Sequence, residues 1–272
     1  VPRRFGPRRF WAQAAELGVT WISAGPTLHR MILDHPGDAP ATLRFTRSCS
    51  SALAPELMRE AERRYGVPMV EAYGMTEATH QMTSNPLPPA PRIPGSVGVP
   101  AGAEVRIVDV AGADVAAGEP GEVAIRGPGL TPGYLHNEQA NADAFFDGWF
   151  RTGDEGTLVD GYLHLRGRLK EMIIRGGENI SPYEIEAVLQ AHPQVAEAVV
   201  FGVDDAKYGQ TVAAAVVLRG PATAADVREQ ARRSLAAFKV PDRIHILDEI
   251  PKTPTGKVQR SRMAARLEED GG

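Results

Sequence analysis

The stretch Trp149–Glu186 constrains the fold of this chain more than any other part of its sequence. Two short runs, TLV and YLHL, alternate apolar and polar residues around Asp160-Gly161, a strong signal for a type I′ hairpin turn. The glycine pair Gly176-Gly177 comes next, and Ser181 then precedes a proline, as an N-cap does at the start of a helix. This order of elements, namely a strand, a hairpin, a glycine loop and a helix, predicts a hinge that binds a nucleotide.

Two charged residues of this stretch can bind a nucleotide. The carboxylate of Asp154 can accept hydrogen bonds from two ribose hydroxyls, and the planar guanidinium of Arg168 can donate to ribose or phosphate. Taken alone, either residue fits an Asp–Arg ion pair on a surface hairpin better. The nucleotide interpretation therefore depends on the other motifs of the chain.

The composition is that of an ordinary globular protein, since 43% of the 272 residues are hydrophobic and the net charge is −4. This length accommodates one large domain or two smaller ones. The charge gives no indication of nucleic acid or an acidic membrane as a partner, and no apolar run approaches the ~18 residues that span a bilayer. The single cysteine, Cys49, excludes an internal disulfide and indicates a reducing, cytoplasmic location.

A second group of candidate residues follows a predicted strand at Val67–Val70, in the sequence EAYGMTEATH. Tyr73 can stack on an adenine ring, Thr76 can bind a phosphate oxygen, and Glu77 can hold Mg²⁺, which prefers carboxylate oxygen. Upstream, the small residues of SCSSA (48–52) would let the backbone approach a flat ligand closely. The same small residues also fit an ordinary turn between a strand and a helix.

The third motif, PKTPTGKVQR, spans Pro251–Arg260 and presents Lys257 on a loop rich in threonine, proline and glycine. A basic loop near the end of a chain is commonly a solvated surface. A catalytic role is the alternative, because a flexible ammonium can stabilise charge that develops on carboxylate and phosphate oxygens during a reaction.

In this order and spacing, the motifs resemble those of the adenylate-forming superfamily of acyl-CoA synthetases, luciferases and adenylation domains. The shared signatures are YG-x-TE, TGD, GR, a glycine-containing loop before an IE helix, and the lysine motif ending in TGK. The segments RSCSSALAP, PGSVG, GRLKEMIIRGGENISP and FKVP resemble in particular those of oxalate–CoA ligases and related peroxisomal-type CoA synthetases.

The resemblance implies an α/β plus α+β fold. Residues 1–168 would be the C-terminal part of the large AMP-binding domain, with mixed sheets and a small β subdomain, and residues 169–272 a small mobile α+β C-terminal domain. Residue patterns also predict individual elements, namely helices at 10–17, 55–65, 141–146, 182–191 and 225–235, and strands at 19–23, 44–48, 67–70, 105–110, 121–126, 195–203, 211–218 and 243–248.

The reaction that the resemblance implies is that of an AMP-forming acid–thiol ligase. A carboxylate attacks the α-phosphate of MgATP, and the CoA thiolate then displaces AMP from the acyl-adenylate. The expected partners are a small-molecule carboxylate, ATP and CoA, and the expected cofactor is Mg²⁺.

The resemblance also assigns roles to residues. Catalysis would fall to Lys257, Thr76 and Glu77, with Glu77 also holding the metal. Lys170 would be the hinge between the two half-reactions, and Gly176-Gly177 would line the CoA path. The ATP or AMP site would comprise Ser51, Ala52, Glu71, Ala72, Tyr73, Gly74, Met75, Thr76, Asp154, Arg168 and Lys257.

Oxalate or another short carboxylate is the expected acyl substrate. Ser50 and His80 flank the adenine and magnesium motifs and could donate hydrogen bonds to a second carboxylate. Ordinary turn hydrogen bonding explains these two residues equally well, and His29 is expected to be a packed or surface histidine. A medium-chain fatty acyl-CoA synthetase, a carrier-loading adenylation domain and a catalytically inactive remnant stay open as alternatives.

One part of the superfamily pattern is absent from these 272 residues. The Ser/Thr/Gly-rich phosphate loop with its GTTG-x-PK core would stand upstream of the motifs, and no Walker-type substitute is present. The sequence therefore leads us to expect a fragment or a truncated gene product without ATP–pyrophosphate exchange of its own.

Overall fold

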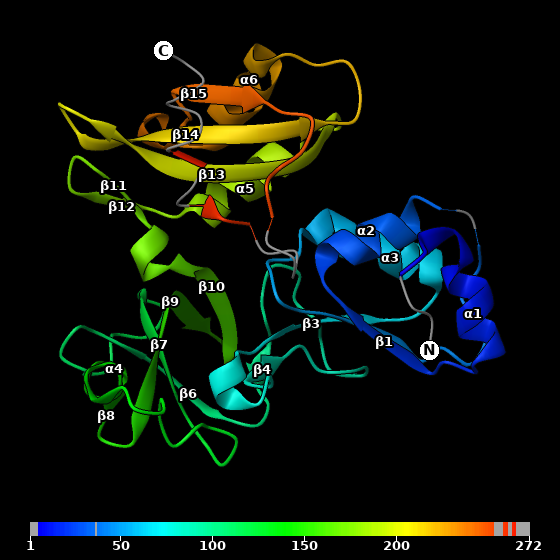
Figure 1. The fold of residues 1–272 in the computed structure, drawn as a ribbon, viewed down its shortest axis with the longest axis horizontal. Coiled ribbons are helices and arrows are strands. Elements are labelled where there is room, and N and C mark those ends of the chain that lie inside the picture. Colours follow the sequence, from blue (N-terminus) through cyan, green and yellow to red (C-terminus); the bar gives the residue numbers. More distant parts are fainter. Residues whose placement is uncertain (1–4, 36, 253–257, 261–262, 265–272) are drawn as a thin grey trace. The chain divides into compact units, whose positions relative to one another are not determined.

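The computed structural model describes residues 5–35, 37–252, 258–260 and 263–264, and the chain divides into two compact units (Figure 1). Unit 1 comprises Val1–Thr152 with Gly156–Leu165, and unit 2 comprises Gly153–Glu155 with Arg166–Gly272. Both units combine helices with sheets, which agrees with the predicted α/β plus α+β fold class. The domain division after residue 168 stays a prediction.

The first sheet of unit 1 has five strands in sequence order: β1 (Trp21–Ala24), β2 (Phe45–Ser48), β3 (Met69–Tyr73), β4 (Thr83–Ser84) and β5 (Val99–Pro100). The first three are parallel. Parallel neighbours need crossover connections, which here are the helices α2 (Pro26–Leu33) and α3 (Pro55–Tyr65). Strands and helices therefore alternate along the chain from β1 to β3.

The three α-helices that precede β3 bury apolar residues in one shared core beside this sheet. Trp11 and Ala14 of α1 (Phe10–Glu16) share a core with Ile32 of α2 and with Met58 and Ala61 of α3. This spacing of apolar residues on α3 is the helical period that predicted it. The helix begins with a proline in its first turn and ends before Gly66, whose φ of 70° stops it. A short 3₁₀ helix, η1 (Pro7–Arg9), precedes α1.

The second sheet of unit 1 has the order β10-β9-β7-β6, and β8 pairs with β9. The strand bounds are Glu104–Val108 (β6), Gly121–Arg126 (β7), Phe145–Phe146 (β8), Trp149–Val159 (β9) and Tyr162–Arg168 (β10). Asp160 and Gly161 join the last two strands with φ of 50° and 81°. Positive φ at both positions is what a type I′ turn requires, so the predicted hairpin is confirmed.

The described residues of unit 2 include one five-stranded sheet and two helices whose bounds are both described. Its strands are β11 (Ile173–Arg175), β12 (Glu178–Ile180), β13 (Val195–Asp205), β14 (Gly209–Leu218) and β15 (Arg243–Ile246), in the order β12-β11-β14-β13 with β15 beside β14. The helices are α5 (Pro182–Gln190) and α6 (Ala224–Ser234), and short 3₁₀ helices occur as η3 (Leu169–Glu171) and η4 (Ala237–Lys239).

Alternate residues of β13 enter two different cores of unit 2. Ala198 and Val200 pack with residues of α5 and α6, while Val199 and Phe201 pack with Ile250 and Met263. A strand with apolar residues on both faces is covered on both sides. The helices therefore cover one face of the sheet, and the chain near the C-terminus covers the other.

The helix predicted at 141–146 is wrong in its bounds. The helix α4 spans Glu138–Ala144, because the side chain of Asn137 accepts a hydrogen bond from the Ala140 backbone N–H and starts the helix earlier. The last two residues of the predicted helix form β8 instead. Ser181 caps α5 as predicted, since its hydroxyl accepts a hydrogen bond from the backbone N–H of Glu184.

Three further features were missed or misplaced by the sequence patterns. The helix α2 was not predicted, and neither was the β11–β12 hairpin. The strand predicted at 67–70 begins later and continues to Tyr73, so that the first three residues of the EAYGMTE motif belong to β3.

Candidate functional site

Glu71 lies on β3 with its side chain inside unit 1. The residue is 4% exposed, and its Oε1 accepts a 2.9 Å hydrogen bond from the backbone N–H of Leu53. Among the described residues, its Oε2 has no hydrogen-bond partner. Burial raises the pKa of this carboxyl to about 8, although the Leu53 bond opposes the effect. The side chain of Glu71 therefore fixes the loop before α3 and is largely protonated at neutral pH.

The turn after β3 is the 3₁₀ helix η2 (Thr76–Ala78). Thr76 is exposed and Glu77 is half-buried. The hydroxyl of Tyr134 donates a 3.0 Å hydrogen bond to Oε1 of Glu77, and the backbone N–H of Thr131 donates a 2.6 Å bond to its carbonyl oxygen. These contacts set the direction of the Glu77 carboxylate and leave it accessible.

The two predicted ligand loops of unit 1 contain unusual backbone conformations. Ser50, Thr79 and His80 have φ of 77°, 49° and 65°, in the left-handed region. Residues other than glycine adopt this region rarely, and such residues cluster at binding sites. Gly74 is required in the same turn, because a Cβ there would lie 2.3 Å from the carbonyl oxygen of His80. The turn thus brings His80 close to the end of β3.

The loop between β2 and α3 exposes its small residues. Ser50, Ser51 and Ala52 are exposed, whereas Cys49 before them and Leu53 after them are buried. The loop is therefore anchored at both ends, and its backbone is accessible between them. A flat ligand can approach such a backbone closely.

A cavity of about 460 Å³ lies next to His80 in unit 1. Its walls are formed by Trp21, Phe45, Arg47, Val70, Thr79, His80, Gln81, Ser84, Asn85 and Leu87. The guanidinium of Arg47 donates to Ser23 Oγ at 3.2 Å, and to the His80 carbonyl oxygen and Gln81 Oε1 at 3.3 Å each. All three acceptors are neutral, and no carboxylate of the described residues pairs with Arg47. The cavity therefore contains a cation without a counter-charge.

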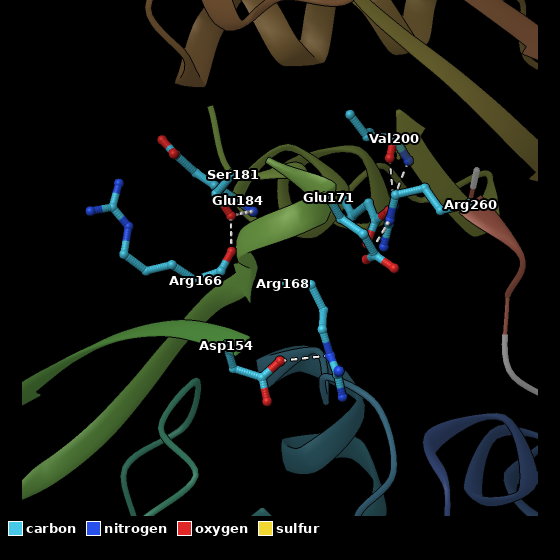
Figure 2. Close-up of polar contacts among 9 residues, drawn as sticks. Asp154, Arg166, Arg168, Glu171, Ser181, Glu184, Val200 and Arg260 are labelled. Atoms are coloured by element: carbon cyan, nitrogen blue, oxygen red, sulfur yellow. Dashed lines mark hydrogen bonds and ion pairs between the residues drawn. The ribbon is translucent and has the colours of Figure 1, made fainter. Parts of the chain in front are cut away.

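Asp154 and Arg168 form an ion pair in unit 2 (Figure 2). The Nε atom of Arg168 lies 2.7 Å from Oδ1 of Asp154, whose side chain is 8% exposed, while that of Arg168 is 40% exposed. The sequence analysis gave an Asp–Arg ion pair as the alternative to nucleotide binding, and this ion pair is present. It also aligns a carboxylate and a guanidinium side by side, which is the geometry that a ribose or phosphate ligand can use.

The predicted hinge and CoA-path residues are all exposed. Lys170 lies on η3, and Gly176-Gly177 form the turn between β11 and β12, with φ of 61° and 90°. A Cβ on Gly177 would meet nothing within 4 Å among the described residues, so backbone conformation rather than space favours glycine there. The N–H of Gly176 donates a 2.8 Å hydrogen bond to the Tyr208 carbonyl oxygen, which fixes the turn.

Lys257 lies outside the described residues, and its predicted role stays a prediction. The residues that flank it are described: Lys252 and Val258 form an antiparallel bridge. Arg260 contacts Glu171 and Glu186 in unit 2. Sequence reasoning gave no role to Arg260 or to Arg47, because the partners of both lie far away along the chain.

His29 is fully buried and its Nε2 lies 3.2 Å from the carbonyl oxygen of Arg47, so the expectation of a packed histidine is confirmed. Burial lowers the pKa of its imidazole. Among the residues that the structure describes, no helix has the length and apolar character to cross a bilayer. The same residues include no group of three or more His, Cys, Asp or Glu side chains that could hold a metal ion.

Comparisons with known proteins match both units. Residues 1–135 match the family described as AMP-binding enzyme, and residues 184–257 match its C-terminal domain. Oxalate–CoA ligase of Arabidopsis thaliana is 49% identical over 96% of this chain and 52% of its own length. Sulfoacetate–CoA ligase of Cupriavidus necator is 42% identical over 97% of this chain and 53% of its own length.

A solved structure gives the same result. ATP-bound MatB from Rhodopseudomonas palustris superposes with a TM-score of 0.89 and 30% identity, over 100% of this chain and 55% of that one. The chain thus spans about half the length of the proteins it matches. Its motifs, its folded units and its relatives agree, and the chain belongs to the adenylate-forming AMP-binding enzyme family.

Proposed function

We propose that this chain functions within an AMP-forming acyl-CoA ligase, which converts a carboxylate, ATP and CoA into acyl-CoA, AMP and pyrophosphate. The observation that carries the proposal is the 49% identity to an oxalate–CoA ligase over 96% of the chain. The match covers 96% of the chain, and so most of both units. The cytoplasm is the proposed location, since Cys49 is a free buried thiol.

In the first half-reaction, residues of unit 1 would bind the nucleotide. Tyr73 would stack on the adenine ring, and the accessible backbone of Ser51 and Ala52 would face the same ring. The hydroxyl of Thr76 would donate a hydrogen bond to a phosphate oxygen. These roles are supported by the position of Thr76 on an exposed turn directly after β3.

Glu77 fits the proposed magnesium ion. Mg²⁺ commonly keeps several waters and binds one or two carboxylates together with the phosphates of its substrate, so a single oriented carboxylate is sufficient. The hydrogen bond from Tyr134 holds the Glu77 carboxylate in one direction. When bound, the ion would neutralise charge on the phosphate oxygens, and Glu77 would hold it there.

Residues of unit 2 would bind the ribose and the reacting phosphate. The carboxylate of Asp154 would accept hydrogen bonds from the ribose hydroxyls, and the exposed end of Arg168 would donate to the nucleotide. Lys257 would place its ammonium beside the carboxylate and the α-phosphate, where negative charge develops during adenylation.

In the second half-reaction, the C-terminal domain, proposed as residues 169–272, would turn at Lys170 and bring Gly176-Gly177 to the acyl-adenylate. Motion of this kind assembles two catalytic arrangements in turn. The exposed side chain of Lys170 and the exposed glycine turn support this role.

The proposed substrate is a short carboxylate that carries a second acidic group, such as oxalate. The cavity beside His80 supports this choice, because the unpaired Arg47 can neutralise an acid that reaches it. An aliphatic tail would instead bury the Arg47 cation further and supply no counter-charge, which is costly. Ser50 stays a candidate contact, although it is not among the residues that form the walls of this cavity.

A substrate panel tests the proposal. The full-length enzyme would be assayed with oxalate, malonate, sulfoacetate, acetate and octanoate, using CoA or a phosphopantetheinylated carrier protein as acceptor. We expect the diacids and sulfoacetate with CoA to give the highest kcat/KM. Arg47→Gln should reduce this preference over acetate by about 10-fold or more, the scale of one charge-assisted hydrogen bond. Preference for octanoate, or for the carrier protein, would contradict the proposal.

A further inference from the structure

Arg260 follows Lys257 by three residues, and groups from three parts of unit 2 surround its guanidinium (Figure 2). Its Nε donates a 3.2 Å hydrogen bond to Oε2 of Glu171 on η3. Its Nη1 donates both to Oε1 of Glu186 on α5 and to the carbonyl oxygen of Val200 on β13. Its Cζ lies 5.2 Å from the centre of the Tyr183 ring, in cation–π geometry.

These contacts hold Arg260 as a buried charged group. Its side chain is 10% exposed and that of Glu186 is 13% exposed. Burial alone would lower the pKa of Arg260, but the carboxylates of Glu186 and Glu171 outweigh burial and raise it. Oε1 of Glu186 also accepts a 2.7 Å hydrogen bond from the Val200 N–H. Arg260, Glu186 and Val200 thus form a closed ring of hydrogen bonds, which gives the guanidinium a single position.

The chain on both sides of Lys257 is attached to the sheet of unit 2. Lys252 pairs with Val258 across an antiparallel bridge, and its Nζ lies 2.7 Å from Oε2 of Glu197 on β13. Farther out on each side, Ile250 and Met263 are buried in the same core. Arg260 adds an attachment to η3, the segment that carries the proposed pivot Lys170.

The proposed pivot Lys170 lies in the sequence between two residues that form ion pairs, Arg168 and Glu171, and Figure 2 shows both pairs. Arg168, two residues before Lys170, pairs with Asp154, and Glu171, directly after it, pairs with Arg260. The side chain of Lys170 is exposed and makes no hydrogen bond or ion pair with the described residues. Side-chain ion pairs therefore anchor residues on both sides of Lys170, while the side chain of Lys170 itself has no such anchor among the described residues.

We propose that Arg260 is a positioning residue that ties the segment carrying Lys257 to the C-terminal side of the hinge. The inference rests on the proposed function, because it takes Lys257 as the adenylation lysine and Lys170 as the pivot. With Glu171 bonded to Arg260, a rotation at the pivot would move residues 258–260 by the same angle. This attachment would help to return Lys257 to one position in each cycle, as a near-attack geometry requires.

Hydrogen exchange tests the attachment without any assay of activity. Glu171→Gln removes one charge of a partly exposed pair, with a Glu171 side chain that is 29% exposed, so the fold should survive. In the 272-residue chain we expect about fivefold faster amide exchange both in residues 169–173 and in residues 252–260, the scale of one ion pair. Glu229→Gln, which breaks an exposed pair within α6, is the matched control and should change neither segment. Faster exchange in 169–173 alone would overturn the proposal.

The two half-reactions test the positioning role. In the full-length enzyme, Arg260→Lys keeps a charge but cannot reach all three acceptors at once. We expect adenylation to fall about 10-fold more than transfer of a supplied acyl-adenylate to CoA, because only the first step uses Lys257. Equal losses in both steps would mean that Arg260 is merely structural. If Lys257→Ala leaves adenylation intact, the proposed function fails, while the exchange result still decides the attachment.

Discussion

The backbone N–H of Leu53 donates a 2.9 Å hydrogen bond to Oε1 of Glu71, and this bond joins the loop before α3 to the strand β3. The Glu71 carboxyl that accepts it is buried, with a pKa raised to about 8. A buried carboxyl that is largely protonated at neutral pH therefore joins two predicted nucleotide-binding segments.

The first prediction follows from the direction of this shift. A carboxyl whose pKa is higher in the folded state binds its proton more tightly there than in the unfolded chain, where the value is 4.5. Its stabilising effect is complete below pH 4.5 and is lost as the pH rises to about 8, with a slope of at most ~1.4 kcal/mol per pH unit. Glu71→Gln should remove that slope and stabilise unit 1 at pH 8.

Urea unfolding at pH 5, 6.5 and 8 measures this effect. The free energy of unfolding of the variant, minus that of the unmodified chain, should become more positive as the pH rises. Glu119→Gln changes an exposed glutamate and serves as the control. A difference that does not vary with pH would show that Glu71 is ionised in the folded protein.

The second prediction concerns the catalytic lysine. Lys257→Ala should reduce adenylation in the full-length enzyme by about 10²–10³-fold, the scale of losing one transition-state contact. Transfer of a supplied acyl-adenylate to CoA should be nearly unchanged. Pyrophosphate exchange and single-turnover thioester formation measure the two steps separately. Equal loss in both would rule out the assignment of Lys257 to the first step.

The third prediction tests the ribose contact of Asp154. ATP should have a KM about 10-fold or more below that of 2′-deoxy-ATP, because a hydrogen bond to a charged acceptor contributes ~1.5–3 kcal/mol. Asp154→Asn should bring the two KM values together, mainly because it raises the KM for ATP. Asp248→Asn, at an exposed position of unit 2, should keep the difference. Undiminished discrimination in the Asp154 variant would exclude the contact.

The fourth prediction concerns a substitution at Gly177. It separates the effect of the added side-chain volume from the effect of backbone strain. Gly177→Leu should slow the CoA half-reaction and spare adenylation, since its side chain would enter the proposed thiol path. The φ of 90° would also strain a leucine there. Gly161→Leu is the matched control, because Gly161 has a φ of 81° in another hairpin turn, with nothing within 4 Å of its Cβ position. The proposal fails if both variants lose the same step to the same extent.

Local signals in the sequence were sufficient for features that neighbouring residues determine. The turn at Asp160-Gly161 and the cap at Ser181 depend on conformational preferences of one or two residues, and both were predicted. The three-residue strands β11 and β12 are too short to show a period, and α2 begins at the proline of a Gly-Pro pair that also fits a turn.

The candidate site shows the same limit. The motif residues could be named because their order in the chain resembles a family. Arg260 and Glu171 are 89 positions apart, and Arg47 and His80 are 33 apart. Contacts at such separations exist only after the sheets have formed, so nothing in the local sequence indicates the role of either arginine.

The strand β9 is continuous from Trp149 to Val159, yet its middle residues Gly153–Glu155 belong to unit 2 and the residues on either side belong to unit 1. A chain that begins at Arg166 retains both cores of unit 2 but not Asp154, and its Arg168 lacks the acidic partner. No single cleavage of the peptide chain separates the two units intact. A recombination event that exchanged the C-terminal module at one crossover would therefore join an Arg168 from one parent to an Asp154 from another, and only parents with matching residues would restore this ion pair.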